Sequence, residues 1–106
     1  MRPSHPGAIL SGMIEGLREE TRKDYPVTEL ASGLGVSSAT LSSILDQKSA
    51  INAEMAVKLS EAFSTSADLW LNLQRNYDLW EAENKVNRGE ITHFVVNGDD
   101  SGRLSA

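Results

Sequence analysis

The chain has 106 residues, a net charge of −5 at pH 7 and no cysteine. This length sets one small domain, and a composition of 40% hydrophobic and 24% charged residues is that of a globular protein. The lack of cysteine excludes disulfide scaffolds, zinc fingers and thiol chemistry, and the excess of acidic residues weighs against a general binder of nucleic acids or membranes.

No apolar run approaches the roughly 20 residues that a membrane-spanning helix needs. Residues 1–6 also lack the apolar core of a secretion signal. We therefore expect a cytoplasmic protein without a membrane partner.

The first predicted helix begins at Pro6, because a proline at the first helical position costs no hydrogen bond. It should end by Asp24, since the residue before Pro26 is disfavoured in a helix. Its apolar residues recur at helical spacing on one face: Ile9, Leu10, Met13, Ile14 and Leu17.

Two short helices are predicted next. The first begins at Thr28, whose hydroxyl is expected to cap it, and ends at Gly35, which tolerates the left-handed conformation of a helix end. The second covers 38–45, with Ser37 as its N-cap.

A fourth helix is expected after the cap residue Asn52, and the serine- and threonine-rich segment 64–66 should end it. A longer helix then begins after Ser66 and continues to about Lys85, with a wide apolar band that contains both tryptophans. We expect this band to form a two-fold dimer interface, with a purely monomeric core as the alternative. The predicted interface residues are Leu69, Trp70, Leu73, Tyr77 and Trp80.

The segment 91–96 has the composition of a strand, and the sequence leaves two possibilities open for it. It either orders as a strand, against a second copy or a partner's sheet edge, or it is a frayed terminus. The predicted architecture is therefore all-α, with a five-helix domain over residues 1–88 and a C-terminal tail over 89–106.

The second and third predicted helices have the pattern of a helix-turn-helix. A small residue, Ala31, stands where two closely crossing helices need one, and Gly35 occupies the turn. Five apolar positions agree with the same arrangement: Leu30, Leu34, Val36, Leu41 and Ile44. An ordinary pair of packed helices is the alternative.

In such a motif the second helix enters the major groove of DNA. Hydroxyls and helix N-termini then contact phosphates, and the outward side chains face the bases. The candidate DNA-binding residues are Thr28, Ser37, Ser38, Ala39, Thr40, Ser42, Ser43, Gln47 and Lys48. The alternative for any one of these serines is a plain solvated surface residue. Between Val27 and Lys48 there is one cation against two anions, so each protomer should bind DNA weakly.

Catalysis is not expected, because the chain has no nucleophile elbow, phosphate loop or metal triad. His5 and His93 lack a third ligand at metal-binding spacing, so we expect no metal and no cofactor. Residues 78–106 carry 3 cations and 6 anions, including Asp78, Glu81 and Glu83. These carboxylates form either a solvated face or a surface for a basic partner.

Three stretches of the chain resemble the HigA-type antitoxins of the Xre/Cro-like helix-turn-helix group. They are the opening HPGAIL at 5–10, the helix-turn-helix core at 30–37, and the aromatic segment LWLNLQ at 69–74 with YDLW at 77–80. Simpler Xre-like repressors share the middle stretch but not the last. The chain departs from the family pattern in having Ala8 in place of glutamate, and in lacking a cation near the start of the recognition helix.

The resemblance implies an all-α dimer that represses its own operon at operator DNA. It also implies that the protein neutralises a small, basic, RelE-like mRNA-cleaving toxin encoded beside it. The alternatives are a stand-alone Xre-like regulator without a toxin partner, and an interaction module that has lost DNA binding.

Overall fold

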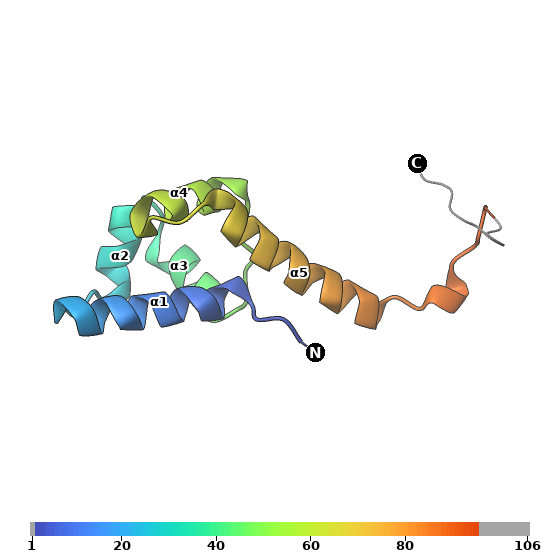
Figure 1. The fold of residues 1–106 in the computed structure, drawn as a ribbon, viewed down its shortest axis with the longest axis horizontal. Helices are drawn as coiled ribbons and strands as arrows, with labels where there is room; N and C mark the ends of the chain where they lie inside the picture. Colours follow the sequence, from blue (N-terminus) through green and yellow to red (C-terminus); the bar gives the residue numbers. More distant parts are fainter. Residues whose placement is uncertain (1, 96–106) are drawn as a thin grey trace.

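The computed structural model describes residues 2–95 and contains five α-helices followed by one short 3-10 turn. The elements are α1 (Pro6–Thr21), α2 (Val27–Leu34), α3 (Ser38–Leu45), α4 (Ala53–Phe63), α5 (Ala67–Lys85) and η1 (Arg88–Glu90). Helices α1 to α4 and the start of α5 form the body of the molecule, and the rest of α5 projects from it (Figure 1). The all-α prediction is confirmed.

Local capping explains three of the helix starts. Ser37, Asn52 and Ser66 each accept a hydrogen bond from the backbone N–H three residues further along. The caps at Ser37 and Asn52 were predicted from the sequence. Gly35 ends α2 with a φ of 73°, in the left-handed conformation predicted for it.

The prediction that Thr28 caps α2 was wrong. The helix begins one residue earlier, at Val27, and its N-cap is Pro26, which provides no side-chain hydrogen bond. The backbone carbonyl of Pro26 accepts from the N–H of Leu30, so the extended proline sets the first turn and Thr28 lies inside it, exposed.

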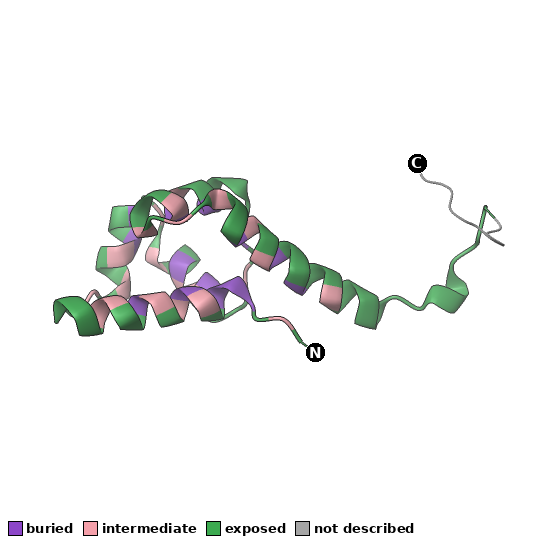
Figure 2. Cartoon of the chain, viewed as in Figure 1, coloured by how far each residue is buried: buried purple, intermediate pink, exposed green. Residues whose placement is uncertain are grey.

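Buried residues of all five helices form the core of the body (Figure 2). Helices α2 and α3 pack against each other, α1 lies on α3, and α4 packs against both α2 and α5. The buried hydrophobic residues of this core are Leu10, Ile14, Ala31, Leu34, Leu41, Ile44, Ile51, Met55, Ala56, Leu59 and Trp70.

The N-terminal arm lies against α5. Arg2 donates a hydrogen bond of 3.0 Å to the hydroxyl of Tyr77, and its guanidinium carbon is 5.6 Å from the ring centres of both Tyr77 and Trp80. His5 is buried, packs edge-on against Tyr77 and caps α1 through Nδ1, which accepts from the N–H of Gly7. Burial lowers the pKa of His5, although the carboxylate of Asp78 opposes this shift.

Of the two possibilities left open for the end of the chain, the structure shows no strand. Residues 91–95 form no strand, and every residue from Glu81 to Val95 is exposed. A single apolar segment has no second strand here with which to pair. Val96 and the rest of the predicted tail lie outside the described residues. No helix in the described range 2–95 is both long and apolar enough to cross a membrane.

Candidate nucleic-acid interface

The turn between α2 and α3 has the geometry that the sequence pattern predicts. Ala31 is only 1% exposed where the two helices pack together, and Leu41 and Ile44 turn the inner face of α3 into the core. The left-handed Gly35 allows the chain to reverse direction between the helices. These contacts hold α3 in place, with its opposite face turned away from the core.

The free face of α3 carries small and hydroxyl-bearing side chains. Ala39 and Thr40 are exposed, whereas Ser38, Ser42 and Ser43 are half-buried. An exposed helix face of this kind fits into a major groove without steric hindrance and offers hydroxyls to base edges or phosphates.

The hydroxyls of Ser37 and Thr40 work as a pair at the start of α3. Ser37 Oγ accepts from the backbone N–H of Thr40 at 3.1 Å and donates to Thr40 Oγ1 at 2.9 Å. Because Thr40 Oγ1 accepts from Ser37, the Thr40 hydroxyl can donate its own proton to an acceptor outside the protein. The first N–H groups of α3 also have no acceptor within the helix, so this end favours an anion such as a phosphate.

The loop 46–51 follows α3 directly. Gln47 has a φ of 63° and is exposed, as is Lys48. The carbonyl of Ser43 accepts from the N–H groups of Lys48 and Ser49, and the hydroxyls of Ser43 and Ser49 are 2.6 Å apart. The Ser43 hydroxyl, predicted to face DNA, thus holds the loop that presents Lys48.

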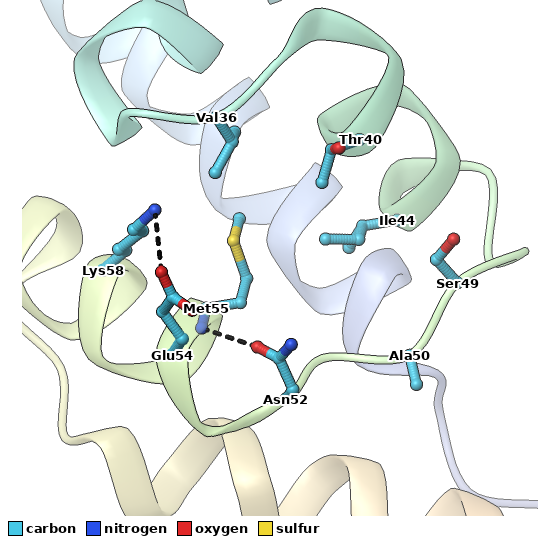
Figure 3. A pocket seen from close by; sticks show the side chains of 9 residues that line it. All are labelled: Val36, Thr40, Ile44, Ser49, Ala50, Asn52, Glu54, Met55 and Lys58. Carbon is cyan, nitrogen blue, oxygen red and sulfur yellow. Dashed lines mark hydrogen bonds and ion pairs between the residues drawn. The ribbon is translucent and has the colours of Figure 1, made fainter.

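A cavity of about 200 Å³ lies between this loop, α3 and α4 (Figure 3). Val36, Ile44 and Met55 form its apolar side, and Thr40 and Ser49 are among its polar residues. The nearby Lys58 donates to the carbonyl of Gly35 at 3.2 Å and pairs with Glu54 at 3.6 Å. Lys58 is a cation beside the helix-turn-helix that the sequence analysis missed, because it belongs to the next helix.

The predicted dimer residues do not lie on one surface. Trp70 is fully buried in the core of its own protomer, where Nε1 donates to Thr65 Oγ1 at 2.7 Å. Tyr77 is buried under the N-terminal arm, Leu73 and Trp80 are half-buried, and Leu69 is 39% exposed. A fully buried Trp70 has no surface to offer to a partner.

An apolar surface lies instead at the projecting end of α5 and in the segment that follows it. Leu79 is 55% exposed, Val86 49% and Ile91 56%, and together with Ala82 they line an open groove. We call these four residues the α5 outer face. The spacing of Leu79, Ala82 and Val86 was the available signal, but the sequence alone does not show that the body ends before this part of the helix.

Comparisons with known proteins agree with this geometry. A family model described as helix-turn-helix matches residues 14–70. Among curated proteins, the uncharacterized HTH-type transcriptional regulator YbaQ of Escherichia coli is 37% identical over 84% of this chain and 74% of its own length.

Solved structures of antitoxins are similar over their whole length. The antitoxin GraA is 35% identical, with a TM-score of 0.73 over 89% of this chain and 99% of its own. The Pseudomonas aeruginosa antitoxin HigA, solved with the higBA promoter, is 36% identical, with a TM-score of 0.69 over 89% of this chain and 100% of its own. The chain therefore belongs to the helix-turn-helix family of DNA-binding regulators, on the branch that holds the HigA-type antitoxins.

Proposed function

We propose that this protein is the antitoxin of a type II toxin-antitoxin pair, which represses its own operon as a DNA-bound dimer. The observation that carries the proposal is the similarity to Pseudomonas aeruginosa HigA over that antitoxin's full length, in a structure that holds its own promoter. A likeness restricted to the helix-turn-helix would not distinguish an antitoxin from a simpler repressor.

The proposed DNA contacts come from two adjacent segments. The start of α3 offers the Thr40 hydroxyl and free backbone N–H groups, and the following loop offers Gln47 and Lys48. Ser38, Ala39 and Ser42 face the groove between them, and Thr28 stands at the start of α2 as a further phosphate contact. With so few cations, two protomers are needed to gather enough phosphate contacts.

The dimer that we propose forms through the α5 outer face rather than through Trp70. Its side chains are apolar and exposed, and they lie on the last turns of α5 and in the segment directly after it. Such a surface favours association with a partner. A symmetric pair of such helices would set the spacing between two copies of α3, and hence between operator half-sites.

Replacing Leu79 with glutamate tests this dimer. Leu79→Glu places a charge in the apolar groove, and we expect the dimer to dissociate more than about tenfold more readily. The measurement is sedimentation at micromolar concentration. Asn84→Glu is the control, because Asn84 is exposed on the same helix and does not line the groove. Equal dissociation of the two variants would rule out this face.

The proposed toxin is a small, basic, RelE-like protein. Asp78, Glu81 and Glu83 in the C-terminal part are exposed and suit a basic partner. Residues 78–106 carry −3 of the net charge of −5, so more than half of the net negative charge lies outside the helix-turn-helix, where it would repel DNA.

Two measurements on the full chain test the proposed function together. Expression of the neighbouring gene should arrest growth, and co-expression of this protein should restore growth through a stable complex. The protein should also shift a duplex from its own upstream region, and Lys48→Ala should lower the salt dependence of binding by about one phosphate per protomer. Operator binding without a toxic neighbour would favour the alternative function, a stand-alone transcriptional regulator.

A further inference from the structure

A buried glutamine joins the DNA-facing loop to α5. Gln74 is 6% exposed, and its Oε1 accepts from the backbone N–H of Ile51 at 2.8 Å. Its Nε2 donates to Oδ1 of Asp78, also at 2.8 Å. Gln74 therefore links Asp78 to Ile51 through two hydrogen bonds, and we call this chain the relay. Its outer end is the exposed carboxylate of Asp78 on α5.

The inner end of the relay holds one side of the loop 46–51. At the other side, Ser43 holds Lys48 and Ser49 through its carbonyl and its hydroxyl. Ile51 is 2% exposed, so its N–H has no access to water and depends on Gln74 for an acceptor. The loop is therefore fixed at both ends, and one of the two anchors belongs to α5.

We propose that Gln74 is a positioning residue for DNA binding. It belongs to α5, the helix that ends in the α5 outer face, and it fixes the position of the loop that carries Lys48. Gln74 touches no DNA in this arrangement and acts through the backbone of the loop. The inference rests on the proposed function, because it concerns the affinity for operator DNA. The relay also makes the affinity for operator DNA sensitive to a partner that contacts Asp78. A cation that binds the Asp78 carboxylate competes with Gln74 Nε2 for this acceptor.

Two neutral variants of Asp78 separate the relay from simple electrostatics. If charge alone matters, removing the negative charge should strengthen DNA binding equally in both. We expect Asp78→Ala, which lacks an acceptor, to bind operator DNA about fivefold more weakly than Asp78→Asn, which keeps one. Both variants remove the same charge, and Asp78 is exposed, so both should fold.

Two double variants of equal net charge provide the decisive comparison. In Gln74→Glu with Asp78→Asn, the asparagine amide donates to the glutamate. The bond between positions 74 and 78 is then kept with donor and acceptor exchanged, and the glutamate still accepts from the N–H of Ile51. In Gln74→Glu with Glu81→Gln, the new carboxylate faces Asp78 without a donor. The first should bind the operator as the wild type does, and the second about fivefold more weakly, whereas an effect of net charge alone on DNA binding leaves the two equal.

The measurements are operator affinity by fluorescence anisotropy and melting temperature for each variant. Rescue of affinity in the first double variant supports the relay. Equal affinities for Asp78→Ala and Asp78→Asn, or for the two double variants, overturn it while leaving the proposed function intact. Failure of the wild type to bind its upstream DNA overturns the proposed function and the relay with it.

Discussion

Gly7→Ala is expected to destabilise the protein by about 3 kcal/mol. A Cβ built on Gly7 overlaps the backbone carbonyl oxygen of Ile44, at the end of α3. A backbone oxygen cannot move aside as a flexible side chain does. The same carbonyl accepts from the N–H of Gln47, so a shift of α1 away from α3 also disturbs the start of the loop 46–51.

Gly12→Ala is the matched control on the same helix. A Cβ at Gly12 meets nothing within 4 Å, so alanine adds helix propensity without a clash and should stabilise the protein by about 0.5–1 kcal/mol. Urea denaturation followed by circular dichroism measures both free energies of unfolding. Two changes of the same sign would contradict the close packing of Gly7 on α3.

Trp70→Ala is expected to cost about 4 kcal/mol, because it empties the position of the largest fully buried side chain in the core. This is a large share of the roughly 5–15 kcal/mol that stabilises a domain. Trp70→Phe keeps a ring but loses the hydrogen bond to Thr65, and should cost about 1–2 kcal/mol. Leu69→Ala, at the neighbouring exposed position, should cost less than about 1 kcal/mol.

The same variants distinguish a core tryptophan from an interface tryptophan. If Trp70 belongs to the protomer core, its contribution to stability does not depend on protein concentration. If it lay in a dimer interface, the loss would grow as the protein is concentrated, since association stabilises only the wild type. Melting curves at two concentrations tenfold or more apart decide between these outcomes.

The local elements of the fold were predictable from the sequence because their causes are local. An N-cap such as Ser37 or Asn52 bonds to the N–H three residues further along, and a glycine such as Gly35 ends a helix by its own conformation. The single error among the caps, Thr28, arose where Pro26 set the helix start by its own backbone.

The site was predictable only in outline. Hydroxyls at the start of α3 were expected on an outward face, and Thr40 lies there with its hydroxyl aligned by Ser37. The role of Ser43 in holding the loop depends on its contact with Ser49, six residues away across a turn. Spacing within one helix carries no information about such a contact.

The sequence by itself determined the five helices, the helix-turn-helix and the family, because these follow from periodicity, capping and short-range motifs. Only the tertiary structure decided which apolar residues are buried and which remain exposed. Trp70 and Leu79 have the same character in the sequence, but α4 and the core cover the first, whereas α5 leaves the body before the second. Burial depends on which elements meet in space, and the contact of Gln74 with Ile51, 23 residues away, exists only after they have met.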